Sequence, residues 1–480
     1  WLKHQSAEHA CMLEGLRSNV YMASSNISTS PCGFTTPRGV IALLIAVLVL
    51  VDISWVVYYF SGSVKKDQAP AASPSNRQGS PAAAASMAER APLHRSPAAQ
   101  RIRSLRARAQ RAATISLPSL VTVFSAECSA YHDWQAVTLY ESWKRARIPG
   151  IIVRTLACSG ESLGKYHRVD GLGEKLLTHV HESKEHYQAG REGYAPLNKP
   201  WGFMSWLTEG DGRKLSNDTV FLIVDPDFSF RADGVPTQLQ PIVAAVGEGL
   251  VDAVGLDYLY VAKGMAAMNW VLPRKFNASM DVRHLQSIGP PIFLRKDKLS
   301  RLVRGWYDIT LSIVMNPELH DLVHDGHQRA PWIAEMCGYS IAAAGWLDHQ
   351  TQAEWPEVQT PQPPFPTTGG FVAGSPVLLH YSHPFQICGR KFGKALLRNS
   401  DVLDCSDPFP ESDQFSPPSW AELEERSCKC CMAVGDVLGM DSQCFSGPNE
   451  RITKHIAWEA WARVSTGVRT WRSLNCLQPK

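Results

Sequence analysis

Two carboxylates stand one residue apart at the end of an apolar segment, in the sequence Val224-Asp225-Pro226-Asp227. Residues 219–224 (TVFLIV), which run into this pair, have the composition of a buried strand. In open α/β sheets, ligands bind at the carboxyl ends of strands. Two carboxylates there suit a hard divalent cation such as Mg²⁺ or Mn²⁺, which would stabilise a leaving diphosphate. Asp-Pro-Asp is also good turn chemistry, so a simple turn is the alternative.

Three further segments place a polar side chain in an apolar or helical context. Asn198 and Lys199 come just ahead of a helix expected at Pro200. A helix start favours anions, so Lys199 could meet a phosphate, and the alternative is a surface N-terminal cap. Glu335 is the lone acid of an apolar stretch and needs a partner, either a buried structural cation or a polar substrate hydroxyl. His380 follows an apolar run; a lone histidine is more often a core residue, but neutral imidazole is a good Mn²⁺ ligand.

The elements that must position these residues begin near residue 116. Short β-branched runs alternate with segments of helical spacing, which predicts an α/β fold with a mostly parallel sheet. The expected strands are 120–125, 151–157 and 219–224, and the expected helices are 131–147, 200–209 and a Trp-bearing stretch from about 448 to 473.

The N-terminal part of the chain has a different composition. Residues 39–60 are nearly all apolar and reach the ~20 residues that a membrane-spanning helix needs, although Asp52 interrupts them. A late signal-peptide core is the alternative. Residues 61–116 are rich in Ala, Pro, Ser and Arg, which predicts a flexible stem. The basic residues of this stem would place the C-terminal mass in the cytosol by the positive-inside rule.

The domain organisation follows from these changes of composition. We expect an N-terminal tail (1–38), a transmembrane anchor (39–60), a basic stem (61–116), a folded domain (117–412) and a Cys-containing extension (413–480). The 480 residues carry a net charge of only +3, which argues against a dedicated nucleic-acid binder. A single long apolar stretch excludes a multispan transporter.

The cysteines and glycosylation sequons bear on the compartment. Cys428, Cys430 and Cys431, with Cys444, could bind zinc, but they lack the paired C-x-x-C arrangement, so disulfides or free thiols are favoured. Lumenal exposure would favour disulfides. Two N-glycosylation sequons, which begin at Asn217 and Asn277, weakly support a lumenal domain.

An ordered set of motifs resembles one enzyme family. Residues 121–158 resemble the start of the plant and algal peptidyl serine α-galactosyltransferases, through a strand, an acid-Cys pair and the sequence Asp-Trp-Gln. The sequences LNKPWGFMSWL, VDPDFSF and IGPPIFLRKDKL are closer to the related hydroxyproline O-arabinosyltransferases. The sequence PWIAEMCGYSIAAA at 331–344 is similar to both. The resemblance covers roughly residues 120–410, with these segments in the expected order.

This resemblance implies a Golgi enzyme with a GT-A-like fold, one membrane anchor and a lumenal catalytic domain. Such enzymes move arabinofuranose or galactose from a UDP-sugar to hydroxyproline or serine hydroxyls of extracellular glycoproteins. The resemblance assigns a metal to Asp225, Asp227 and His380, and donor binding to Asp133, Gln135, Asn198, Lys199 and Asp225. It also implies that Glu335 is a catalytic residue that orients the donor sugar or the acceptor.

The acidic motif departs from both branches of the family. The serine galactosyltransferases have a motif closer to Asp-Ala-Asp-Met, and the arabinosyltransferases have Glu in the first position, whereas this chain has Asp-Pro-Asp-Phe. The sequence therefore leaves the donor sugar open. A catalytically silent Golgi protein of the same fold and a lectin-like module are the competing classes. Metal-dependent nucleotide binding distinguishes the enzyme from both.

Overall fold

The computed structural model describes only part of the chain, all of it within one compact unit, Leu93–Lys480. The described residues are 119–163, 173–184, 193–231, 235–258, 261, 285–316, 333–360, 376–394, 397, 405, 416–432, 444 and 450–476. The expected tail, anchor and stem lie outside these residues. Within the described part, no helix combines the length and the apolarity that a membrane span requires.

The centre of the fold is a seven-stranded sheet with the order β3-β2-β1-β4-β7-β6-β8. Its strands are β1 (Leu120–Glu127), β2 (Ile151–Cys158), β3 (Leu176–Glu182), β4 (Val220–Ile223), β6 (Ala253–Asp257), β7 (Ile288–Arg295) and β8 (His349–Gln350). Strand β7 runs antiparallel to both of its neighbours, and the other pairs are parallel. The α/β architecture with a mixed, mostly parallel sheet, predicted from the sequence, is thus confirmed.

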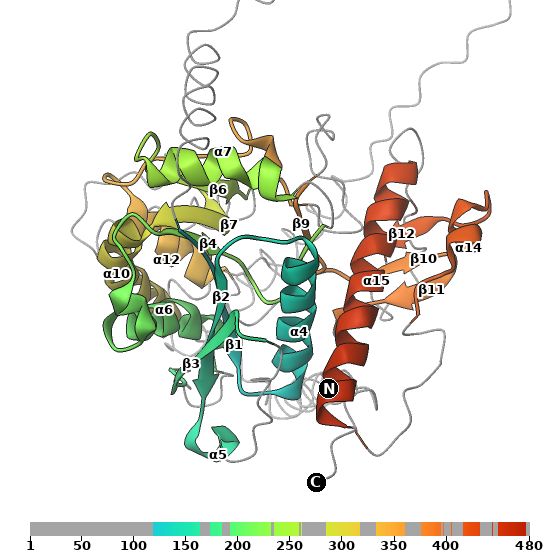
Figure 1. Cartoon of the computed structure of the whole chain (residues 1–480), viewed down its shortest axis with the longest axis horizontal. Coiled ribbons are helices and arrows are strands. Elements are labelled where there is room, and N and C mark those ends of the chain that lie inside the picture. The colour runs from blue at the N-terminus through green and yellow to red at the C-terminus, as the bar shows by residue number, and fades with distance from the viewer. Residues whose placement is uncertain are drawn as a thin grey trace, which may run out of the picture. The chain divides into compact units, whose positions relative to one another are not determined.

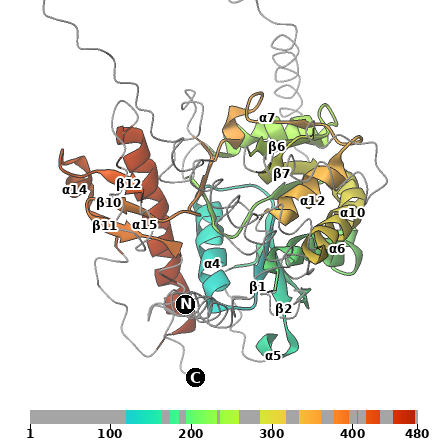
Figure 2. The ribbon, with the colours of Figure 1, turned by 180° about the vertical axis from the view of Figure 1, so that it is seen from behind.

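Helices cover both faces of this sheet, and they lie on opposite sides of it in Figure 1 and Figure 2. The helices are α4 (Ala130–Arg145), α5 (Gly160–Leu163), α6 (Asn198–Thr208), α7 (Val235–Gly247), α10 (Lys296–Met315), α12 (Ala334–Ala343), α14 (Trp420–Glu424) and α15 (Glu450–Asn475). Within β1, Val121 and Val123 pack with α6, α10 and α12, whereas Leu120 and Phe124 pack with α4, α7 and α15. Strands β1, β2 and β4 are largely apolar because both of their faces are buried, whereas the edge strand β3 keeps several residues exposed.

Two small sheets complete the described structure. Strand β5 (Phe228–Phe230) pairs with β9 (Leu378–His380), and a second sheet has the order β11-β10-β12. The strands of that second sheet are β10 (Phe385–Ile387), β11 (Arg390–Phe392) and β12 (Cys430–Met432). Short 3₁₀ helices are η1 (Ala195–Leu197), η2 (Asp211–Lys214) and η4 (Pro356–Val358).

The C-terminal residues share a core with the main sheet. Helix α15 lies directly beside α4 in both views, and its Trp461 and Trp471 belong to the same buried cluster as Trp134 of α4. The predicted Trp-bearing helix from about 448 to 473 is therefore confirmed as α15, and these two tryptophans are packing residues. The close approach of the two helices depends on Gly467, which faces Thr138.

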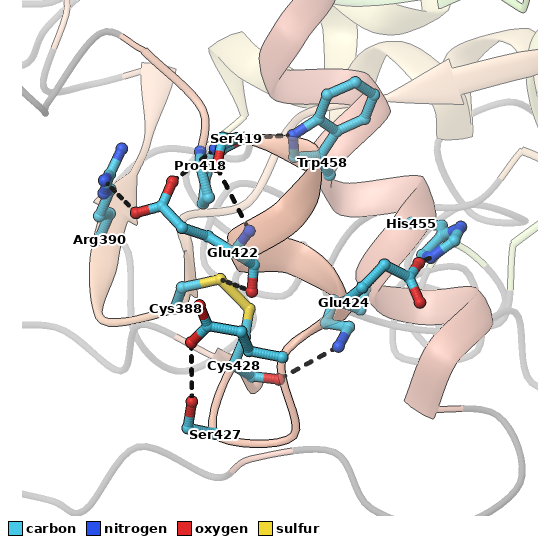
Figure 3. Close-up of a disulfide and its surroundings, with 12 residues drawn as sticks. Cys388, Arg390, Pro418, Ser419, Glu422, Glu424, Ser427, Cys428, His455 and Trp458 are labelled. Atoms are coloured by element: carbon cyan, nitrogen blue, oxygen red, sulfur yellow. Dashed lines mark hydrogen bonds and ion pairs between the residues drawn. A yellow bond between two sulfur atoms is a disulfide. The ribbon is translucent and has the colours of Figure 1, made fainter.

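Disulfides rather than zinc account for the C-terminal cysteine cluster. Within the described residues the disulfides are Cys128–Cys158, Cys388–Cys428, Cys405–Cys476 and Cys431–Cys444. Only the buried thiol of Cys430 is left in the cluster, so the zinc alternative is wrong and the disulfide interpretation is confirmed. Figure 3 shows the Cys388–Cys428 bond, which ties the β10–β11 turn to the segment after α14.

Candidate metal centre

The two small strands β5 and β9 bring a histidine to the strand-end carboxylates. Strand β4 ends just before Asp225, and β5 starts directly after Asp227. In the β5–β9 pair, Phe228 lies opposite His380, and the two rings stack with centroids 4.4 Å apart. His380 Nε2 consequently lies 3.2 Å from Asp227 Oδ1. Backbone pairing between segments distant in sequence therefore builds this contact.

The predicted metal ligands lie together. One ligand atom from each of Asp225, Asp227 and His380 falls within 4.8 Å of the others. The Asp227 and His380 side chains are 7% and 12% exposed, whereas that of Asp225 is 25% exposed, so the cluster is open to solvent at Asp225. Carboxylate oxygens with one imidazole nitrogen form a donor set that suits Mn²⁺ or Mg²⁺. The residues present thus fit the expected cation.

Each carboxylate of the cluster also pairs with a lysine. Lys199 Nζ lies 2.6 Å from Asp225 Oδ1, and Lys394 Nζ contacts Asp227 Oδ2. Burial opposes ionisation of Asp227, but Lys394 and His380 together hold its pKa well below the usual range. Burial likewise opposes the charge on Lys394, and Asp227 nevertheless raises the pKa of that lysine. The centre therefore contains fully charged groups of both signs.

Lys199 extends the centre to Glu335. Its Nζ atom lies 3.1 Å from Glu335 Oε2, and the Glu335 side chain is only 5% exposed. The backbone of this residue is also held, because its N–H donates to Tyr194 Oη and its carbonyl accepts from Trp306 Nε1. Burial raises the pKa of Glu335 to about 7, although Lys199 opposes the shift. The partner that the lone acid needed is therefore Lys199, which bridges Glu335 and Asp225.

Asn198 has a positioning role rather than that of a surface cap. It lies in the first turn of α6 and is only 2% exposed. Its Oδ1 accepts from the Lys184 N–H at 2.7 Å, and its Nδ2 donates to Ser183 Oγ at 3.2 Å. Lys199 is also buried, at 8% exposed, so the surface-cap alternative is wrong for both residues. Asn198 fixes the segment after β3 against the start of α6.

Asp133 and Gln135 are engaged inside the protein. Asp133 Oδ1 accepts from Arg154 Nη1 at 2.9 Å, and these side chains are 2% and 0% exposed. Gln135 is also 2% exposed, and its Nε2 donates to the Tyr131 carbonyl at 3.1 Å. A donor nucleotide would not reach either side chain in this conformation. Their predicted role in donor binding stays a prediction.

Lys394 is the residue of the centre that the sequence motifs missed. It follows β11 and lies 167 residues from its partner Asp227. One signal was available, because no acid occurs between Glu357 and Asp401 while several cations do. A partly buried cation without a local acid needs a distant one. That signal indicates a long-range ion pair without identifying the partner.

The fold and the centre together define a class of protein: an α/β domain whose sheet presents a candidate divalent-cation site flanked by lysines. Comparison with known families identifies it further. Residues 120–352 match the model of the hydroxyproline O-arabinosyltransferase family N-terminal domain. Residues 120–352 are therefore similar to this domain, and the resemblance seen in the motifs is confirmed.

Several curated relatives are named glycosyltransferases. The chain is 28% identical over 344 residues to a peptidyl serine alpha-galactosyltransferase of Chlamydomonas reinhardtii, an alignment that covers 66% of this chain and 42% of that protein. The galactosyltransferase of the same name from Arabidopsis thaliana is 28% identical over 341 residues, with 68% and 37% covered. Hydroxyproline O-arabinosyltransferase 1 of Arabidopsis thaliana is 23% identical over 230 residues, with 46% and 54% covered. The chain thus spans less than half the length of these two galactosyltransferases.

Solved structures give a weaker similarity. The galactosyltransferase LgtC, in complex with donor and acceptor sugar analogues, matches with a TM-score of 0.31 and 12% identity, over 54% of this chain and 86% of that chain. His380 and Lys394 lie beyond residue 352, where the family match ends. The centre is therefore completed by a part of the chain outside the matched domain.

Proposed function

We propose that this chain is a glycosyltransferase that moves arabinofuranose or galactose from a UDP-sugar to hydroxyproline or serine hydroxyls of extracellular glycoproteins, with Mn²⁺ or Mg²⁺ as cofactor. The observation that carries the proposal is the cluster of Asp225, Asp227 and His380 next to β4, with Lys199 and Lys394 beside it. The names of the relatives support the two sugars and the two acceptor residues. The expected GT-A-like fold agrees with the mixed sheet and its strand-end ligands.

The residues of this centre would act through electrostatics. A bound divalent cation supplies positive charge that offsets charge developing on the departing diphosphate. Lys199 and Lys394 add two ammonium groups in a partly buried site, where preorganised charges are worth more than in water. Glu335 contacts Lys199 and is nearly fully buried, so it would fix the position of this lysine relative to Asp225. That role explains why an acid stands in an otherwise apolar helix.

We further propose a Golgi location, with residues 39–60 as a single membrane anchor and the folded domain in the lumen. Disulfides persist in oxidising compartments and are rare in the cytosol, and the described residues contain several of them. The first residue of one sequon, Asn217, is exposed in a turn. These features favour the lumen over the cytosolic orientation that the basic stem suggests.

The direct test is donor turnover by the purified full chain. UDP-arabinofuranose and UDP-galactose are supplied with and without Mn²⁺ and with hydroxyproline- or serine-containing peptides. We expect manganese-dependent transfer from one donor, abolished in Asp227→Ala. Asp211→Ala is the matched control, because Asp211 is a 72% exposed acid of η2 paired with Lys214. Correctly folded protein that turns over neither donor would favour a catalytically silent member of the fold.

A further inference from the structure

Trp420, the first residue of α14, is the most exposed large apolar side chain among the described residues. It is 52% exposed, and every other tryptophan that the structure describes is buried or half-buried. Single exposed apolar residues are common on protein surfaces and need no explanation by themselves. Trp420 differs from such residues because aromatic rings and polar side chains are assembled around it.

Two aromatic side chains of α15 meet Trp420 at steep angles. Its ring centroid lies 5.1 Å from that of Trp458, with 78° between the ring planes. The His455 ring lies 4.9 Å away, with 64° between the planes. Neither neighbour therefore stacks parallel to the Trp420 ring, and about half of the residue stays open to water.

The backbone around Trp420 is fixed, as Figure 3 shows for the segments on either side of it. Trp458 Nε1 donates a hydrogen bond of 2.7 Å to the Pro418 carbonyl. Ser419 caps α14, and the Glu422 side chain accepts in return from the Ser419 N–H. The Cys388–Cys428 disulfide holds the segment that follows α14. A rigid support of this kind lowers the entropic cost of binding a ligand.

Polar side chains border the exposed ring. Glu424 lies four residues after Trp420 and thus on the same side of α14. Its Oε1 lies 2.8 Å from His455 Nε2, and its Oε2 lies 3.5 Å from Arg451 Nη2. All three polar side chains are at least partly exposed. They supply carboxylate acceptors and guanidinium donors of hydrogen bonds next to an aromatic surface.

The size and chemistry of this surface fit a sugar ring. Ile452 is the only other exposed large apolar side chain of α14 and α15. An aromatic side chain buries about 150–250 Å², whereas a standard protein interface needs about 800 Å² from each partner. The patch is therefore too small for a stable protein contact. A neutral sugar can lay its C–H face on the electron-rich ring, while its hydroxyls reach the polar side chains.

Strand β11 connects this surface to the candidate metal centre. Arg390 in β11 pairs with Glu422 of α14, and Lys394, four residues later, contacts Asp227. At about 3.3 Å per residue, these two points lie no more than about 13 Å apart along the chain. Trp420 also lies beyond residue 352, where the family match ends. The surface is thus a second candidate site, separate from the centre but within reach of one extended glycopeptide.

We propose that Trp420, with Glu424, His455 and Arg451, forms a carbohydrate-binding platform that takes a neutral sugar ring of an already glycosylated acceptor protein. The inference rests on the proposed function for the identity of this acceptor, whereas sugar binding at the platform needs neither metal nor nucleotide. A sugar held there would raise the effective concentration of the remaining acceptor chain at the centre.

The test measures saccharide binding to the full chain without Mn²⁺ and UDP. A galactan tetrasaccharide and an arabinan tetrasaccharide are titrated by calorimetry, and saturation-transfer NMR identifies bound sugar protons. We expect at least one of them to bind the wild type. Trp420→Ala should weaken this binding at least tenfold, because the ring surface is lost, whereas Trp420→Tyr keeps a ring and should remain within about threefold of the wild type.

Two controls keep the result interpretable. Leu163→Ala removes another exposed apolar side chain, 45% exposed on α5, and should leave saccharide affinity unchanged. Saturating UDP with Mn²⁺ should not displace the saccharide, because the platform and the metal centre are separate. If Trp420→Ala does not fold in a thermal melt, Trp420→Met is measured in its place, since it removes the ring and keeps apolar volume.

Each outcome bears on a separate claim. Folded wild type that binds neither saccharide, or a wild-type affinity in Trp420→Ala, would overturn the inference and leave the proposed function intact. Displacement of the saccharide by UDP and Mn²⁺ would assign the binding to the metal centre and overturn the inference as well. Trp420-dependent binding to phosphatidylserine vesicles without saccharide binding would instead indicate a membrane contact. Trp420-dependent saccharide binding by a protein that turns over no donor would support the platform and overturn the proposed function alone.

Discussion

A single methyl group at the contact between α15 and α4 should destabilise the protein. A Cβ atom at Gly467 would lie 1.9 Å from Thr138 Oγ1 and 2.7 Å from Thr138 Cα. The Cα belongs to the backbone of α4, so a rotamer change cannot relieve the clash and the two helices must separate. Overpacking of this kind costs about 1–3 kcal/mol, occasionally more, whereas Gly→Ala inside a helix returns about 1 kcal/mol. We therefore expect Gly467→Ala to lower the free energy of unfolding by about 2 kcal/mol.

The same substitution at Gly305 in α10 provides the matched control. There a Cβ would meet Ala342 Cβ at 3.6 Å, which is an ordinary contact, so only the gain in helix propensity remains. Gly305→Ala should raise the free energy of unfolding by up to about 1 kcal/mol. Urea unfolding followed by tryptophan fluorescence measures both variants. If Gly467→Ala proved as stable as the wild type, the docking of α15 on α4 would be refuted.

The remaining predictions concern the buried charges and the disulfides. Asp133→Asn should cost about 3 kcal/mol in urea unfolding, because it removes the charged partner of the fully buried Arg154; the UDP affinity of the folded variant tests the predicted donor-binding role of Asp133, which an unchanged affinity would refute. The pKa of Glu335 is raised to about 7, so this group stabilises the fold below its ordinary pKa and loses that contribution as the pH rises to about 7. Glu335→Gln should accordingly gain roughly 2–3 kcal/mol relative to the wild type between about pH 4 and pH 8; a difference that does not vary with pH in thermal melts would refute the shift. Replacing Cys388 and Cys428 by serine opens a loop of 40 residues and should cost about 2–4 kcal/mol in urea unfolding; equal stability would show that this disulfide does not constrain the chain.

The main elements of the fold could be predicted because a strand that is buried on both faces is an apolar run in the sequence. Strands β1, β2 and β4 lie between two helical layers, and their apolar runs reflect that environment directly. Helix α6 begins at Asn198, two residues before the start expected from Pro200. The difference arises because the 3₁₀ helix η1 runs directly into α6. Pro200 therefore lies within the first turn of α6 and does not begin the helix. Helix boundaries depend on such details, which residue periodicity does not record.

The candidate site was only partly predictable. Asp225 and Asp227 could be found because their position at a strand end is a local property. The partnership of Asp227 with Lys394 depends on how β9, β10 and β11 return to β5, and a long-range pairing leaves no local pattern. Arg154 illustrates the same limit, since it lies inside the apolar strand β2 and its role appears only once Asp133 of α4 packs beside it.

The central claim is that Asp225, Asp227 and His380 hold a divalent cation together with a nucleoside diphosphate. Crystals of the protein grown with Mn²⁺ and UDP, with diffraction recorded at the manganese absorption edge, test it most directly. The account predicts one strong anomalous peak within about 2–2.6 Å of a ligand atom from each residue, with the diphosphate in contact with Lys394. A fully bound UDP with no anomalous peak at this cluster, or a peak at other side chains, would contradict it.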